Sequence, residues 1–428
     1  MNNEFEEAYR ALLENLYGLQ RAGVKYTLDN ILFLLEAVDN PHLKWPSIHV
    51  AGTNGKGSTS AQMAAILQQA GYKTGLYTSP HLINFTERIR VNGREMLPAD
   101  VTEFMQIIQP AIDEIHPSFY EVTTAMAFWE FARQKVDIAV IETGLGGRLD
   151  STNVITPLIS VITPIGMDHS DYLGDTLEAI AGEKAGIIKP GVPCITSNRD
   201  EAVLKVFQEK CKKNHSSFYK VFDYIEYQML ASDLTGTRFQ YWSESNPTPK
   251  TAFISLAGEH QMENALLAIH ALKLLSNTFP IPEKAMNALE KVRWPGRLDV
   301  IHNEPLVIVD VSHNREGFQQ TMSFLKPFVK PSKTKIVLLL QSNKPYKDIA
   351  KQLSGKSEAV YVVDMSLGNP VKAAVLKREL EKNHVRVEVV NSIEKLQGRI
   401  DDSAKTDAWL IIGSHYLAGE VYNSLHLS

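Results

Sequence analysis

The chain has 428 residues, more than the roughly 250–300 that one hydrophobic core supports, so two domains are expected. With 44% hydrophobic and 22% charged residues, the composition is that of an ordinary globular protein. The net charge of −5 excludes bulk electrostatic attraction to nucleic acid or to an anionic membrane. An anionic substrate would therefore need a local cluster of cations.

The two cysteines, Cys194 and Cys211, lack a metal-ligand spacing and are too few for a disulfide framework, which fits a reducing cytoplasm. Residues 1–7 are acidic and polar, so they cannot serve as the basic start of a secretory signal. No apolar run reaches the ~18 residues that a membrane span requires. We expect a soluble, cytoplasmic protein.

Short apolar runs alternate with helical patterns along the first 275 residues, which predicts βαβ units around a mostly parallel sheet. In chain order, the expected elements are a strand at 46–51, a helix at 58–70, a helix at 122–134, strands at 138–142 and 158–163, a helix at 176–187, a strand at 194–196 and a helix at 261–275.

A second series of elements begins after Trp294-Pro-Gly-Arg297, where the Pro-Gly pair marks a turn. Buried strands are expected at 306–311, 335–340, 359–363, 385–390 and 409–413. These patterns predict an α/β protein with an ATPase domain of the phosphate-loop type at 1–297 and a smaller Rossmann-like domain at 298–428. A cleft between two such domains is a usual place for a ligand.

A glycine-rich loop lies between the first expected strand and the helix after it. Residues 48–58 read Ile-His-Val-Ala-Gly-Thr-Asn-Gly-Lys-Gly-Ser, and the loop residues of interest are Thr53, Asn54, Gly55, Lys56, Gly57 and Ser58. Backbone N–H groups and the helix N-terminus favour phosphate there, and Lys56 can reach the β- and γ-phosphates. The loop is a variant of the common motif, because Val50 replaces its first glycine and Gly57 separates Lys56 from Ser58. The alternative is a glycine-rich surface turn with a chance lysine.

The segment Gly144-Leu-Gly-Gly147 lacks the spacing of a dinucleotide-binding loop and is not interpreted as one.

Polar residues that could hold Mg²⁺ follow several expected strands. Glu142 ends one strand, Asp168 and His169 follow another, and Ser79 and His81 come after a further short apolar segment. Ligands of parallel sheets gather at the carboxyl ends of the strands, and Mg²⁺ prefers a few oxygen ligands together with phosphate and water. Taken singly, Glu142 is as well explained by an ion pair or helix cap, and the Asp-His pair by a hydrogen-bonded turn.

Three further residues carry alternatives of the same kind. Lys184 lies on an expected helix, where a solvated lysine paired with Glu183 would be ordinary. Asp310 ends the first strand of the second domain and could hold a ribose or a metal-bound group. His313 could contact a transferred phosphoryl group, while Ser312 or Asn314 could instead cap a helix.

Ten segments in order resemble the folylpolyglutamate synthase / dihydrofolate synthase family of the Mur ligase superfamily, along nearly the whole chain. They are Gly-Thr-Asn-Gly-Lys-Gly-Ser (52–58), Thr-Ser-Pro-His-Leu (78–82), Thr-Glu-Arg-Ile-Arg-Val-Asn-Gly (86–93), Glu-Thr-Gly-Leu-Gly-Gly-Arg-Leu-Asp-Ser-Thr-Asn (142–153), Met-Asp-His (167–169), Leu-Gly-Asp-Thr (173–176), Gly-Glu-Lys-Ala-Gly-Ile (182–187), Gly-Glu-His-Gln-Met-Glu-Asn (258–264), Trp-Pro-Gly-Arg (294–297) and Asp-Val-Ser-His-Asn (310–314). The phosphate loop alone is shared with other Mur-type ligases.

The resemblance implies that ATP phosphorylates a carboxylate and that the amine of L-glutamate then attacks the acyl phosphate. It further implies a site for ATP at 53–58 with Asn264, Arg297 and Asp310, and His313 beside the transferred phosphoryl group. Ser79, Glu142, His169 and a carbamylated Lys184 would hold Mg²⁺ at two sites. The pterin and its attached groups would meet Arg88, Ser118, Phe119, Tyr120, Glu121, Leu149, Asp150 and Ser151.

The segment 147–150 resembles that of bifunctional bacterial members, which predicts activity on dihydropteroate as well as on folates. The predicted partners are these small molecules, and a monomer is expected. Residues 341–348 depart from the family pattern, so a glutamate-binding role of this loop is in doubt. Lys344 and Lys347 could receive an acidic tail, but solvated surface lysines are favoured. Arg88 and Arg90 are better anion candidates, with an exposed strand face paired to Glu87 as the alternative.

Three other functions remain open at this point. One is tail extension without dihydrofolate synthase activity. Another is a Mur-type ligase for a nucleotide-linked peptidoglycan precursor, whose usual extra N-terminal domain would not fit in the about 47 residues before the phosphate-loop strand. The third is a nucleotide-regulated binding protein, which would not require Lys56, Glu142, His169 and Lys184 together.

Overall fold

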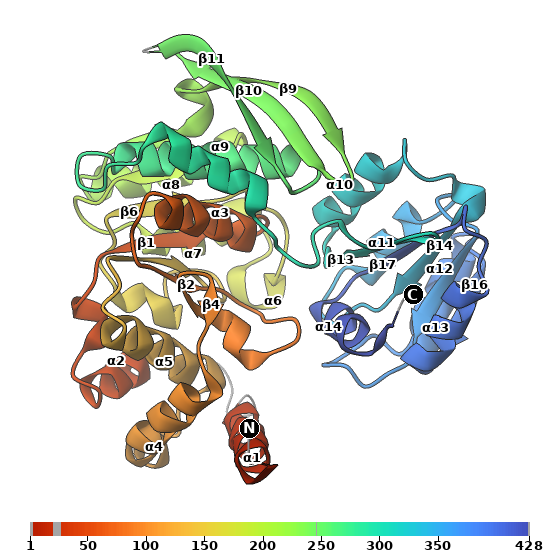
Figure 1. Ribbon diagram of the computed structural model, residues 1–428, viewed down its shortest axis with the longest axis horizontal. Coiled ribbons are helices and arrows are strands. Elements are labelled where there is room, and N and C mark those ends of the chain that lie inside the picture. The colour runs from red at the N-terminus through yellow and green to blue at the C-terminus, as the bar shows by residue number, and fades with distance from the viewer. Residues whose placement is uncertain (1–2, 20–26, 245, 427–428) are drawn as a thin grey trace.

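Two α/β sheets and one small antiparallel sheet organise the protein (Figure 1). The structure is a computed structural model that describes residues 3–19, 27–244 and 246–426. In Figure 1 the first sheet and its helices lie on the left, and the second sheet with its helices lies on the right in blue. No helix among these residues is both long and apolar enough to cross a membrane.

The first sheet has the strand order β4-β3-β2-β5-β1-β6-β7-β8. The strands are β1 (Ser47–Ala51), β2 (Thr74–Tyr77), β3 (Ile89–Val91), β4 (Arg94–Glu95), β5 (Ile138–Glu142), β6 (Ile159–Ile162), β7 (Cys194–Thr196) and β8 (Phe218–Lys220). Pairing is parallel from β2 to β8, whereas β3 and β4 continue the sheet antiparallel. The expected mostly parallel sheet is confirmed.

Helices cover both faces of this sheet. They are α1 (Asn3–Gly18), α2 (Asp29–Glu36), α3 (Lys56–Gln69), α4 (Pro98–Ile115), α5 (Phe119–Arg133), α6 (Ser170–Leu173), α7 (Leu177–Lys184), α8 (Glu201–Lys213) and α9 (Glu259–Leu274), with 3-10 turns at Pro41–Leu43, Phe85–Arg88, Ser151–Val154, Ala185–Ile187, Val221–Asp223 and Glu283–Lys291. Alternate residues of β5 enter different cores, as the two-residue repeat of a strand requires. Val140 packs with α3 and α9, and Ile141 packs with α4 and α5.

A three-stranded antiparallel sheet, which the sequence patterns did not predict, lies over α9. It consists of β9 (Glu226–Asp233), β10 (Gly236–Ser243) and β11 (Asn246–Ile254). Most of its side chains are exposed or half-buried, but Phe239 and Ile254 belong to the core beneath it. The sheet is the green element at the top of Figure 1.

The second α/β sheet has the order β12-β13-β17-β14-β15-β16 and is parallel except for β12. Its strands are β12 (Asp299–Asn303), β13 (Leu306–Asp310), β14 (Thr334–Leu338), β15 (Ala359–Val363), β16 (Val387–Val390) and β17 (Ala408–Ile412). Its helices are α10 (Arg315–Leu325), α11 (Tyr346–Gln352), α12 (Ala373–Lys382), α13 (Ile393–Asp401) and α14 (His415–Ser424), with a 3-10 turn at Pro331–Lys333. Ile336 and Val337 of β14 enter opposite cores. The predicted fold class is therefore confirmed for both units.

Two element predictions need correction. The helix expected at 122–134 begins at Phe119, because Ser118 caps it and exchanges hydrogen bonds with Glu121. The helix expected at 176–187 is α7, which ends at Lys184 and is followed by a separate 3-10 turn.

Candidate functional site

The phosphate loop joins β1 to α3, and the backbone N–H groups of Thr53 and Asn54 both donate to the carbonyl oxygen of Pro164. The Lys56 ammonium donates to the carbonyl oxygens of Gly52 at 3.1 Å and Thr53 at 3.4 Å, so it folds back over the loop. The buried hydroxyl groups of Ser58 and Thr59 have no hydrogen-bond partner within the described residues. An unpaired buried hydroxyl is unfavourable, so these groups fit a site completed by a ligand.

Gly55 allows the loop to pass close to α9. Its φ of +91° favours glycine, and a Cβ there would lie 2.5 Å from the side-chain oxygen of Asn264. Asn264 therefore lies against the loop, although it is far from Gly55 in the sequence. The structure brings the predicted nucleotide residues of α3 and α9 together.

Glu142 ends β5 and lies beside the start of the loop after β2. Its carboxylate accepts a hydrogen bond from the backbone N–H of Ser79 at 3.1 Å. Glu142 is buried, and burial raises the pKa of its carboxyl to about 7 against the opposing effect of Lys56. Neither alternative prediction for Glu142 holds, because its carboxylate neither caps a helix nor forms an ion pair with a described residue.

Lys184 is the last residue of α7 and is only 4% exposed. Burial, and after it the positive charge of Lys56, lowers the pKa of its ammonium to about 7. The alternative of a solvated lysine paired with Glu183 is wrong. Glu183 instead pairs with Arg148 at 3.0 Å, and Lys184 lies inside the protein.

Asp168 joins the two α/β units. Its carboxylate contacts the Lys344 ammonium at 2.6 Å and the Nε2 atom of His313 at 3.3 Å, and both partners come from the second unit. Lys344 also lies 3.4 Å from Nε2 of His169. The prediction that Lys344 is a solvated surface lysine is wrong, since its side chain is 7% exposed. Lys347, by contrast, is exposed as expected.

The charges around Asp168 determine its protonation. Burial acts to raise the pKa of Asp168, but the hydrogen bond from His313 and the charges of His313 and Lys344 outweigh it, so the pKa lies well below its usual value. Burial lowers the pKa of His169 to about 4, so its imidazole is neutral at pH 7. His169 directly precedes α6, and its backbone φ is +53°.

Asp310 ends β13 and is buried at the start of the second unit. Its carboxylate accepts hydrogen bonds from the backbone N–H groups of Leu298 and Ser312 and from the hydroxyl of Thr321. Asn314 caps α10 by accepting the N–H of Gly317, and its amide donates to Asn54 of the phosphate loop at 2.9 Å. The predicted helix cap is confirmed, and it coexists with a contact between the two units.

The residues expected around the pterin have firm local partners. Glu121 accepts hydrogen bonds from the backbone and hydroxyl of Ser118, and Asp150 accepts them from Leu145 and Thr152. The hydroxyl of Tyr120 is buried without a partner among the described residues. Phe119, Asp150 and Ser151 are buried, and Leu149 is half-buried.

Arg88 is buried and donates from Nε to Nδ1 of His81 at 2.8 Å. Its guanidinium also lies 5.1 Å from the centre of the Phe119 ring. The alternative of an exposed strand face paired with Glu87 is wrong, because Arg90 pairs with Glu95 and the Glu87 carboxylate binds backbone N–H groups.

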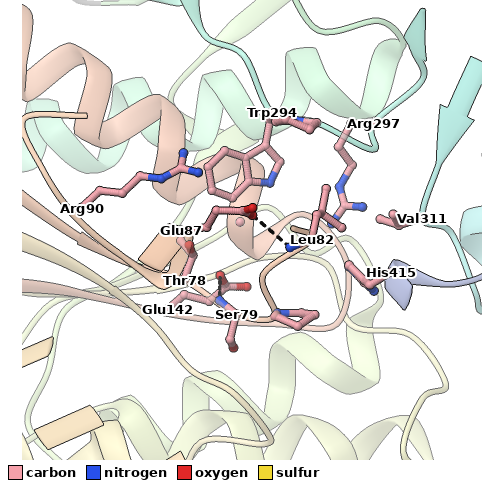
Figure 2. A pocket seen from close by; sticks show the side chains of 13 residues that line it. Thr78, Ser79, Leu82, Glu87, Arg90, Glu142, Trp294, Arg297, Val311 and His415 are labelled. Carbon is pink, nitrogen blue, oxygen red and sulfur yellow. Dashed lines mark hydrogen bonds between the residues drawn. The ribbon is translucent and has the colours of Figure 1, made fainter. Parts of the chain in front are cut away.

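A cleft lies between the units, as expected, and Figure 2 shows its lining. Gly57, Ser79 and Glu142 line one side, and Arg297 and Val311 line the other. The remaining lining residues are Thr78, Pro80, Leu82, Glu87, Arg90, Trp294, Pro295 and His415. Burial lowers the pKa of Arg297, with Asp310 and Glu142 opposing it.

His415 was missed by sequence reasoning. It follows β17 at the start of α14, and its ring centre lies 5.5 Å from that of His313. Its place just after a parallel strand is the signal that could have found it. Burial and the charge of His313 hold its pKa well below the usual value.

Two family models match this architecture. The Mur ligase middle domain matches residues 50–272, and the glutamate ligase domain of Mur ligases matches residues 296–415. The dihydrofolate synthase/folylpolyglutamate synthase of Bacillus subtilis is 37% identical over 364 residues, which cover 83% of this chain and 84% of that protein. The chain belongs to the dihydrofolate synthase/folylpolyglutamate synthase family of Mur ligases.

Solved structures of this family share the whole fold. A Mycobacterium tuberculosis folylpolyglutamate synthase complexed with ADP has a TM-score of 0.88 and 29% identity, covering 99% of each chain. The Escherichia coli FolC in complex with DHPP and ADP has a TM-score of 0.87 and 26% identity, covering 97% of each chain. This membership makes the chain an ATP-dependent ligase.

Proposed function

We propose that the chain adds L-glutamate to dihydropteroate and to the γ-carboxyl of tetrahydrofolate polyglutamates through an acyl phosphate, releasing ADP and phosphate. The observation that carries this proposal is the convergence of Lys56, Glu142, Lys184 and Asp168 on the boundary between the units, where His313 and Lys344 meet them from the second unit. Ligation requires a phosphoryl donor, a carboxylate and an amine at one place, and such a boundary can collect all three.

Triphosphate binding is assigned to residues 53–58. The start of α3 supplies backbone donors and a partial positive charge, and Lys56 supplies a full one. Asn264, Arg297 and Asp310 are proposed to contact the rest of the nucleotide. For Asp310 the firm hydrogen bonds to Leu298 and Ser312 mean that one carboxylate would serve both the backbone and the ligand.

The residues present fit Mg²⁺. No group of three or more His, Cys, Asp or Glu side chains converges in the described part of the chain, but Mg²⁺ usually takes one or two carboxylates and completes its shell with phosphate and water. Glu142 is a buried carboxylate with one hydrogen bond, from Ser79, which suits a nearby cation. Ser79, Glu142, His169 and Lys184 are proposed to hold it. Bound Mg²⁺ would neutralise phosphate charge during transfer.

Carbamylation of Lys184 is supported by its protonation. Only a neutral amine can react with carbon dioxide, and an ordinary lysine with pKa near 10.4 is almost wholly charged at pH 7. With its pKa lowered to about 7, roughly half of the Lys184 side chains are neutral at that pH. The product would carry a negative charge and remove the repulsion between Lys184 and Lys56.

We propose that His313 contacts and positions the transferred phosphoryl group. Its Nδ1 lies 2.9 Å from the backbone oxygen of Val311, which fixes the ring and leaves Nε2 directed at Asp168. The hydrogen-bonded ring is therefore oriented before substrate arrives. The neutral amine of L-glutamate would then form the C–N bond while the C–O bond to phosphate breaks, and the departing phosphate would take up the proton that the amine loses.

We propose that the pterin and its attached groups bind to eight residues: Arg88, Ser118, Phe119, Tyr120, Glu121, Leu149, Asp150 and Ser151. The buried hydroxyl of Tyr120 offers an unsatisfied hydrogen-bonding group, and Arg88 offers a cation. The proposed nucleotide-binding domain ends at residue 297, and the proposed glutamate-ligase domain begins at residue 298. A monomer and a cytoplasmic location stay predictions.

A thermal-shift series separates this function from its alternatives. Stabilisation by Mg-ATP that increases with added dihydropteroate supports the proposal, whereas a response to a uridine nucleotide alone points to a peptidoglycan-type ligase. Absence of any ATP consumption with dihydropteroate and glutamate, beside consumption with tetrahydrofolate, would leave tail extension as the only activity. Consumption with neither acceptor would rule out folate ligation.

A further inference from the structure

The loop that follows β2 is fixed at two points. Its Ser79 N–H donates to Glu142, as described above. Three residues further on, the backbone N–H groups of Leu82, Ile83 and Asn84 all donate to the carboxylate of Glu87, at 2.9, 2.8 and 2.7 Å. One carboxylate therefore holds three consecutive residues in place, and only Pro80 and His81 separate Leu82 from Ser79.

Leu82 leaves its own unit and packs against the other. Its side chain belongs to the hydrophobic cluster of α13, α14 and one face of the second sheet. Figure 2 shows it beside Val311, which directly follows β13. A Cβ built on Gly296, in the connection between the units, would lie 3.5 Å from Leu82 Cδ1.

Gly419 leaves the space in which the Leu82 backbone contacts α14. A Cβ added to Gly419 would lie 2.0 Å from the carbonyl oxygen of Leu82 and 3.0 Å from its carbonyl carbon. Real Cβ atoms do not approach backbone that closely, so any other residue would force Leu82 and α14 apart. The fit thus requires a residue without a side chain at this position.

The helix itself gives no reason for glycine there. Gly419 lies in the interior of α14 and is absent from the residues with positive φ. Glycine in a helix interior is less favourable than alanine, because it loses more backbone freedom on folding. Close approach of the Leu82 carbonyl is the feature in the structure that accounts for it.

We propose that Gly419 and Leu82 form a closure contact that sets the separation of the two domains, and that Leu82 is a positioning residue for Ser79 in ligation. When the domains meet, α14 accepts the Leu82 backbone and fixes the loop that carries Ser79. The expected effect on kcat rests on the proposed function. The effect on the separation of the two domains does not depend on it.

Gly419→Ala tests the contact, and Gly398→Ala is the matched control. Gly398 lies in α13 of the same unit, is exposed, and would place its Cβ with nothing within 4 Å. Both changes replace a helical glycine with alanine, so helix propensity alone favours both variants. Gly419→Ala should nevertheless lower kcat on the order of 10²-fold, since a displacement near 1 Å can have that effect. Gly398→Ala should keep wild-type turnover.

Domain separation provides a readout independent of turnover. Small-angle scattering of full-length protein with Mg-ADP should give a larger radius of gyration for Gly419→Ala than for Gly398→Ala and the wild type. Leu82→Ala, which leaves the α14 backbone unchanged, should also loosen the domains and lower kcat. Equal scattering and equal turnover of Gly419→Ala and Gly398→Ala would overturn the proposal. If Gly419→Ala has the larger radius of gyration but the wild type shows no ligation, only the assigned reaction is refuted.

Discussion

Replacing Glu142 with glutamine should make the ligand-free protein more stable while it abolishes its function. Burial raises the pKa of this carboxyl from 4.5 to about 7. Each pKa unit corresponds to ~1.4 kcal/mol, so the ionised carboxylate destabilises the folded state by on the order of 3 kcal/mol. Glutamine fills nearly the same space and carries no charge, so Glu142→Gln removes this penalty.

The sign of the pH dependence follows from the direction of the shift. In the unfolded chain Glu142 ionises near pH 4.5, and in the folded chain it ionises near pH 7. Between these values the folded state retains the proton that the unfolded state has lost, so wild-type stability falls as pH rises through this window. The gain from Glu142→Gln should therefore be small near pH 4.5 and complete above pH 7.

Thermal denaturation of the apo-protein from pH 5 to pH 8 measures this gain. The exposed Glu209 on α8 supplies a control, because Glu209→Gln should follow the wild type at every pH. Mg-ATP should stabilise the wild type more than Glu142→Gln, and the variant should lose ligation. Identical pH profiles for Glu142→Gln and the wild type would refute the account of this buried carboxylate.

Four other substitutions test the remaining parts of the site. Lys56→Ala should lower turnover on the order of 10²–10³-fold, as removal of a charge-stabilising donor does, and wild-type ATP consumption would refute the role of the loop. Lys184→Ala should be inactive in a product assay and partly recover with added acetate, whereas full activity without acetate would exclude a carbamate. Lys344→Met and Asp168→Asn should be non-additive by ~0.5–3 kcal/mol in denaturation, because each removes the same buried ion pair; strict additivity would contradict the contact.

The two sheets could be predicted because parallel strands buried on both faces form continuous apolar runs. Residues 138–142 and 359–363 match β5 and β15 at both ends. The β9–β11 sheet escaped prediction, since much of it is exposed and its apolar residues do not form such runs. Its place was decided by packing of Phe239 over α9.

Within the site, the sequence could predict those residues whose position depends on a single strand and the loop after it. The phosphate loop follows a buried strand and Glu142 ends one, so the carboxyl-end rule selects both. Lys344 could not be distinguished from a surface lysine, because its burial depends on Asp168, 176 positions away. The contact of Gly419 with Leu82 likewise exists only after both domains have folded and met.

The proposed reaction joins glutamate to a pterin-linked carboxylate in this cleft. The most direct test incubates purified protein with dihydropteroate, L-glutamate and Mg-ATP and measures products by mass. A product heavier by one glutamyl unit, with one ADP formed per unit added, is the predicted result, and tetrahydrofolate should gain further units in the same way. If ATP is consumed but neither acceptor gains mass, the account is contradicted.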